Sequence, residues 1–83
     1  MAKLDDLRTQ LVDLCVEHGL LDRDAALAAL DLDLIESGVI DSTGLATLKA
    51  IIEETWAVDI PEPLFIAELR TLSAVAKYLE KKV

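Results

Sequence analysis

Aromatic residues, glycine and proline are scarce in this sequence of 83 residues. Aromatics make up 4% of the chain, and there are three glycines and two prolines. The frequent turns and aromatic strands of a small β domain are therefore missing. The 53% of residues that are hydrophobic are mainly Leu, Ala, Val and Ile, and Leu and Ala lose little freedom in a helix. The sequence predicts an all-α fold, and its length fits one domain over 1–83.

Cysteine and histidine occur once each, as Cys15 and His18. A single cysteine cannot form an internal disulfide, and these two groups are too few for a structural metal site. We expect a buried thiol and a histidine at a helix end. With no glycine-rich phosphate loop either, the sequence offers no catalytic constellation, and a free-standing enzyme is the least favoured interpretation.

Long apolar runs are also missing, because charged residues interrupt every segment. No stretch approaches the length needed to span a membrane. The start Lys3-Leu4-Asp5-Asp6 is unlike a signal peptide, which places an apolar run after its basic residue. We therefore expect a cytoplasmic protein.

Basic residues are few. Eight Lys and Arg face sixteen Asp and Glu, for a formal net charge of −8. Binding to nucleic acid or to anionic membranes needs clustered positive charge, so both are disfavoured. An acidic surface attracts basic partners at long range. We expect a monomer that binds proteins with basic surfaces.

Leucines recur at helical spacing over residues 4–18, which predicts a first helix. A long connection over 20–41 follows, in which Asp22 or Asp24 could cap a short turn through 25–30. Long connections inside small domains are usually functional.

The second predicted helix runs over 42–56, and either Asp41 or Ser42 can cap its start. Ser42 falls outside the predicted inner face and should be open to solvent. That face comprises Leu45, Leu48, Ile51, Ile52, Thr55 and Trp56.

Two more helices are predicted near the end of the chain. Pro61 and Pro63 indicate a loop, a short helix follows over 64–69, and Thr71 can cap the last helix, over 72–79. The expected fold is a four-helix bundle with a long loop between helices one and two and a short third helix. The residues expected to meet in its core are Leu7, Leu11, Leu48, Ile52, Val75 and Leu79.

The segment Asp33-Leu34-Ile35-Glu36-Ser37-Gly38-Val39-Ile40-Asp41-Ser42 resembles the approach to the phosphopantetheine serine of acyl carrier proteins. The family has an Asp-Ser pair at the start of its second helix, usually followed by Leu or Met. A Gly three residues before the Asp, here Gly38, is most similar to stand-alone D-alanyl, aminoacyl and peptidyl-type carriers. Thr43 departs from the pattern, which puts the usual partner contact at that position in question.

The resemblance implies that Ser42, next to Asp41, carries 4′-phosphopantetheine, whose terminal thiol holds an acyl or aminoacyl group as a thioester. It implies three kinds of partner: a phosphopantetheinyl transferase, a loading ligase and downstream biosynthetic enzymes. We expect the partner-binding surface to comprise Val39, Thr43, Ala46, Lys49, Ala50, Glu53 and Glu54.

Two alternatives compete with this interpretation. An acidic helical interaction module without a prosthetic group would keep the same fold and use Ser42 as an ordinary cap. A calcium-binding hand starting at Asp31 fails, because its sixth position is Glu36 instead of Gly and its twelfth is Ser42 instead of Glu.

Overall fold

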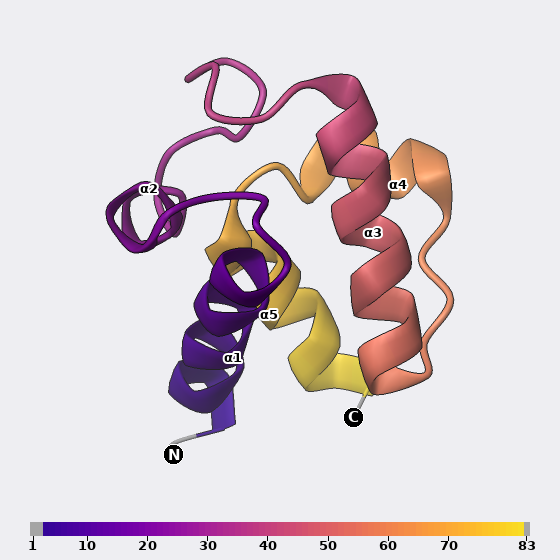
Figure 1. Ribbon diagram of the computed structural model, residues 1–83. Helices are drawn as coiled ribbons and strands as arrows, with labels where there is room; N and C mark the ends of the chain where they lie inside the picture. The colour runs from indigo at the N-terminus through magenta and orange to yellow at the C-terminus, as the bar shows by residue number, and fades with distance from the viewer. Residues whose placement is uncertain (1–2, 83) are drawn as a thin grey trace.

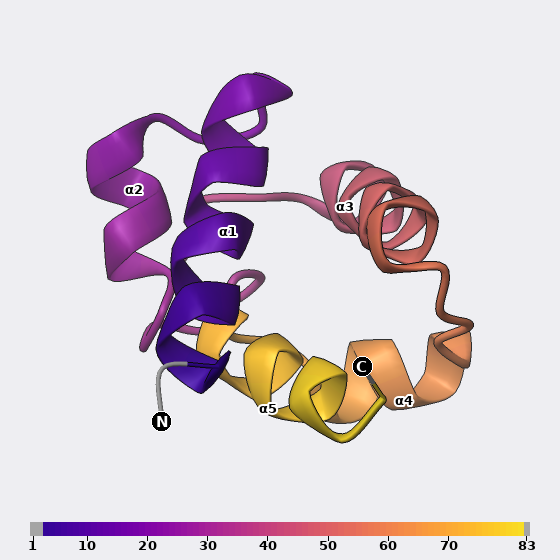
Figure 2. The ribbon, with the colours of Figure 1, turned by 90° about the horizontal axis from the view of Figure 1, so that it is seen from below.

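The computed structural model describes residues 3–82, so both ends of the predicted domain 1–83 lie outside it. The described residues form five helices and no strand, which confirms the all-α prediction (Figure 1). The helices are α1 (Lys3–Glu17), α2 (Arg23–Ala28), α3 (Ser42–Trp56), α4 (Glu62–Glu68) and α5 (Leu72–Lys82). Helix α1 packs against α5 and α2, while α3 and α4 form the opposite side of the molecule (Figure 2).

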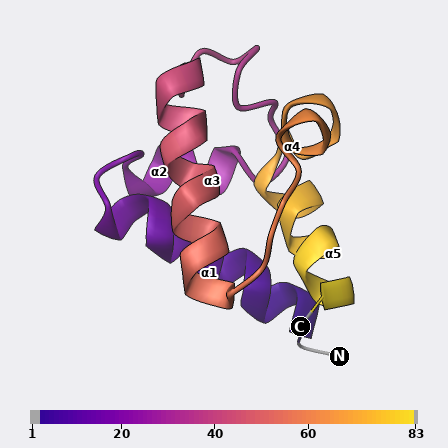
Figure 3. The ribbon, with the colours of Figure 1, turned by 90° about the vertical axis from the view of Figure 1, so that its right-hand side faces the viewer.

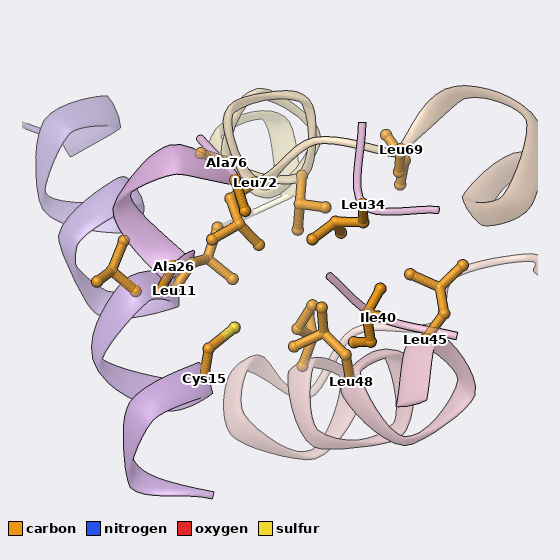
Figure 4. Close-up of a cluster of buried hydrophobic side chains, with 14 of the residues drawn as sticks. Leu11, Cys15, Ala26, Leu34, Ile40, Leu45, Leu48, Leu69, Leu72 and Ala76 are labelled. Atoms are coloured by element: carbon orange, nitrogen blue, oxygen red, sulfur yellow. The ribbon is translucent and has the colours of Figure 1, made fainter. Parts of the chain in front are cut away.

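The hydrophobic core lies between these two sides and draws side chains from all five helices. All six residues predicted to meet in the core are buried: Leu7, Leu11, Leu48, Ile52, Val75 and Leu79. Figure 4 shows Cys15 of α1, Leu48 of α3 and Leu72 of α5 directed into this shared interior. No polar or charged side chain among residues 3–82 is fully buried. The fold is therefore stabilised mainly by removal of apolar surface from water.

The long connection contains a helix of its own, α2, where the sequence predicted only a short turn. Asp22 is the N-cap, and its side chain accepts a hydrogen bond of 2.7 Å from the N–H of Ala25. Ala26 and Ala29 are both buried, so small side chains let this segment lie close to the core. Because the cap precedes Arg23, the helix begins two residues before the predicted turn.

The second predicted helix has the expected bounds, and the third begins earlier than predicted. Pro61 is the N-cap of α4 and Pro63 lies in its first turn, not in a loop. A helix tolerates proline there because the first N–H groups have no partner within the helix. In α3, Thr55 was expected on the inner face but is exposed, and its hydroxyl donates to the carbonyl of Ile51 at 2.8 Å. Within residues 3–82, no helix is long and apolar enough to cross a membrane.

Candidate functional site

The start of α3 shows which of the two candidate caps is used. Asp41 has extended backbone angles, and its side chain accepts a hydrogen bond of 2.7 Å from the N–H of Gly44. Ser42 is therefore the first residue of the helix and not its cap. Its side chain is exposed and makes no hydrogen bond to any residue of the described part of the chain. The structure thus leaves a free primary hydroxyl at this helix start.

The backbone around Ser42 suits a negatively charged group. The N–H groups of Ser42 and Thr43 belong to the first turn of α3, and neither has a partner among residues 3–82. Such N–H groups, together with the helix dipole, favour an anion at the N-terminus. A phosphodiester on Ser42 would be an anion at this place, so the residues present fit a phosphopantetheine group.

Gly44 contributes to the site, although the sequence analysis did not single it out. A Cβ atom at this position would lie 2.6 Å from Cγ1 of Ile40 and 3.3 Å from Oδ1 of Asp41. Real Cβ atoms essentially never approach another atom as closely as 2.6 Å, so a larger residue would have to displace the side chain of Ile40, and its contact with the capping carboxylate would be tight. The position two residues after Ser42 therefore needs glycine for close approach. Its negative φ gives no signal of this, and only the packing reveals it.

A groove of about 480 Å³ lies beside Ser42, between α3 and α4. Figure 3 shows α4 alongside the N-terminal half of α3. The groove is lined by apolar side chains that include Leu45, Phe65 and Ile66, and Ile66 is 50% exposed. Ala46 and Ala50 of the predicted partner surface also line it. The free hydroxyl therefore stands at the edge of a mainly apolar groove.

The side chain of Glu53 connects α3 to the segment that precedes α4. Its Oε2 accepts a hydrogen bond of 2.8 Å from the N–H of Ile60 and pairs with Nζ of Lys49 at 3.1 Å. The Ile60 hydrogen bond, and then the contact with Lys49, lower the pKa of Glu53. Both side chains are part-buried, so their charges largely satisfy each other.

The predicted partner surface is therefore only partly accessible. Thr43, Ala46, Ala50 and Glu54 are exposed on α3. Val39 is half-buried and packs against the core. Lys49 and Glu53 form the ion pair just described, so the freely exposed part of this surface is small and carries the acid Glu54.

Cys15 and His18 lie away from this site, at the C-terminal end of α1 and just after it. Cys15 is fully buried, and burial raises the pKa of its thiol to about 11. In the described part of the chain, no three His, Cys, Asp or Glu side chains are grouped to hold a metal ion.

The comparison with protein families distinguishes the carrier protein from the unmodified interaction module. Residues 18–79 match the family model described as the phosphopantetheine attachment site. The chain belongs to this family. The match covers more than half of the chain and includes Asp41, Ser42 and the groove between α3 and α4. Comparison with curated proteins and with solved structures found no match.

Membership of this family has direct consequences for function. The family carries a 4′-phosphopantetheine prosthetic group, and its domains are carriers without catalytic activity. The protein is therefore a phosphopantetheine-carrying carrier protein with an all-helical fold. When bound, the prosthetic group supplies a thiol at the end of a long flexible arm.

Proposed function

We propose that Ser42 carries the arm and that the protein presents an acyl or aminoacyl thioester to partner enzymes. The observation that carries this proposal is that one residue, Asp41, caps α3 while the next, Ser42, keeps its hydroxyl free. Asp41 caps the helix, so the neighbouring hydroxyl of Ser42 stays exposed and has no hydrogen-bond partner among residues 3–82. An ordinary capping serine would have its oxygen occupied by a backbone N–H.

The chain's own residues hold and orient the attachment point. Asp41 fixes the first turn of α3, and Gly44 lets Ile40 pack beneath it. The N–H groups at positions 42 and 43 lie in the first turn of α3, and they would favour the negative charge of a phosphodiester on Ser42. Tethering then raises the effective concentration of cargo near enzymes that bind the same domain.

The proposal extends to the type of carrier. The spacing from Gly38 to Asp41 supports a stand-alone D-alanyl, aminoacyl or peptidyl-type carrier over residues 1–83, working as a cytoplasmic monomer. Its partners would be a phosphopantetheinyl transferase, a loading ligase and downstream biosynthetic enzymes. Cargo specificity would reside mainly in those enzymes.

The direct test of this function is modification of the intact protein. Purified protein is incubated with a phosphopantetheinyl transferase and coenzyme A, and its mass is measured before and after. We expect a gain equal to one phosphopantetheine group per chain. A protein that keeps its original mass, with a known carrier modified in parallel, would contradict the proposal.

Partner docking is expected on the exposed face of α3. Ala50 is exposed and lines the groove beside Ser42, so Ala50→Arg should leave the fold intact. The long cationic side chain would obstruct the groove and repel a basic partner. We expect modification by the transferase to slow by about tenfold, measured as initial rates, with unchanged circular dichroism.

Ala28→Arg provides a matched control, because Ala28 is also exposed and helical but lies in α2. It adds the same side chain and charge away from α3 and should be modified at the wild-type rate. Equal rates for Ala50→Arg and wild type would place the docking surface elsewhere. Lys49→Glu is a poorer probe, because it also breaks the ion pair with Glu53.

The buried cysteine leads to a prediction about thiol chemistry. Cys15 has no exposed surface and a pKa of about 11, so almost no thiolate forms at neutral pH. The unmodified protein should react only slowly with a maleimide at pH 7, and the modified protein should show one fast-reacting thiol. Fast labelling of the unmodified protein, abolished by Cys15→Ala, would show that α1 opens readily.

A further inference from the structure

The connection that leads to Ser42 is fastened to the corner between α4 and α5. The N–H of Leu72 donates to the carbonyl of Ala29 at 2.9 Å, and the N–H of Leu34 donates to the carbonyl of Arg70 at 2.7 Å. These backbone hydrogen bonds join residues that are far apart in the sequence. The path of the chain toward Ser42 therefore depends on where this corner lies.

Asp33 adds a second attachment at the same place, and its two carboxylate oxygens have different partners. Oδ1 accepts hydrogen bonds of 2.9 Å from the N–H groups of Ile35 and Glu36, which closes a turn. Oδ2 lies 2.9 Å from Nε of Arg70 in an ion pair. The Glu36 hydrogen bond is the largest cause that lowers the pKa of Asp33, and the Ile35 hydrogen bond and the Arg70 charge act in the same direction. The carboxylate is therefore ionised at neutral pH.

The stretch from Asp33 to Ser42 is held at several further points. The N–H of Ile40 donates to the carbonyl of Leu34 at 3.3 Å, which closes the loop on itself. Both side chains are buried, and Figure 4 shows both among the residues of the core. The next residue, Asp41, caps α3. A displacement of Asp33, at the start of this loop, would therefore also shift Ser42, because the loop between them has little freedom to absorb it.

We infer that the ion pair of Asp33 and Arg70 is a positioning element. It fixes the start of the loop over residues 33–42, so that Ser42 is presented correctly to the transferase. The inference rests on the proposed function of Ser42. Arg70 also lines the groove beside Ser42, so it lies on the same side of the molecule. Among the described residues, neither Asp33 nor Arg70 has a hydrogen bond or ion pair with Ser42, so both would act through the loop.

The test uses the unmodified protein and initial rates of transfer from coenzyme A. Asp33→Asn keeps an oxygen for the two backbone N–H groups but removes the charge, and Arg70→Gln removes the opposite charge. Each should raise the KM for the carrier about threefold, because fewer molecules hold Ser42 in the competent position. The kcat should change by less than about twofold, since correctly placed molecules react normally.

The double variant Asp33→Asn/Arg70→Gln distinguishes the pair from two separate effects. Because both substitutions remove the same contact, the double variant should have about the KM of either single variant. Arg70→Lys keeps the charge and should stay near the wild-type KM. Exchange of the Ile40 amide hydrogen should be faster in Asp33→Asn and Arg70→Gln than in wild type. This measurement reports loop motion and needs no enzyme.

The ion pair between Asp13 and Arg23 is the control. It has a similar length, 3.1 Å, but joins α1 to α2, away from Ser42. Asp13→Asn and Arg23→Gln should leave the KM unchanged even where they lower the melting temperature. A KM that follows the melting temperature across all variants would show a purely structural role.

The outcomes separate the two proposals. Suppose that the wild-type protein is modified. If the KM is then unchanged in the Asp33 and Arg70 variants, or if the effects on the KM add up in the double variant, the positioning role alone is overturned. Failure of the wild-type protein to be modified would overturn the proposed function, and the positioning role with it. If Arg70→Gln does not fold, Asp33→Asn and Arg70→Lys decide the question.

Discussion

Ser42→Ala should abolish modification by the transferase. The substitution removes the primary hydroxyl oxygen that would bond to the phosphate of the arm, and the neighbouring hydroxyl of Thr43 is a more hindered, secondary one. The helix itself should be unaffected, because Asp41 supplies the cap and Ser42 makes no hydrogen bond to any described residue. We therefore expect an unchanged circular dichroism spectrum and no gain in mass after prolonged incubation.

Two neighbouring hydroxyls serve as controls for this result. Ser37 and Thr43 are both exposed, and Thr43 follows Ser42 directly. Ser37→Ala and Thr43→Val should still accept one arm each. A mass gain that persists in Ser42→Ala and disappears in Thr43→Val would move the attachment point by one residue and contradict the proposal.

Ile52→Ala should lower the free energy of unfolding by about 2–5 kcal/mol. Ile52 has no exposed surface and lies on the inner face of α3, among the core residues of the other helices. Truncation removes three buried carbon atoms and leaves a cavity that the surrounding helices fill only in part. Chemical denaturation followed by circular dichroism gives the free energy directly.

Ile66→Ala is the matched control, because it deletes the same atoms from a residue that is 50% exposed. It should cost less than about 1 kcal/mol. If Ile52→Ala lowered the free energy of unfolding by as little as Ile66→Ala, Ile52 would not be buried in solution. The inner face of α3 would then be rotated from the one described here.

Much of this fold could be predicted because local rules agree with the tertiary structure. The apolar period predicted α1, α3 and α5. The Thr71 cap before α5 is confirmed by the 3.0 Å hydrogen bond that its hydroxyl oxygen accepts from the N–H of Ala74. The carrier family could be predicted from a short motif together with size, charge and the position of Ser42.

Other features depend on contacts between distant residues and could not be predicted. The pairing of Asp33 with Arg70 joins residues 37 positions apart, and nothing in either local sequence indicates it. The need for glycine at position 44 comes from Ile40, whose side chain turns back under the helix. The choice of Asp41 over Ser42 as the cap was open, because both residue types cap well.

The most direct test of the central claim is to locate the arm within the modified protein. The wild-type protein is modified with transferase and coenzyme A, digested, and the peptide that spans residues 41–44 is fragmented in a mass spectrometer. We predict that the fragment masses place the whole phosphopantetheine group on Ser42. An arm found on Ser37, Thr43 or any other residue, or an unmodified Ser42 in a protein that has gained the mass, would contradict the account.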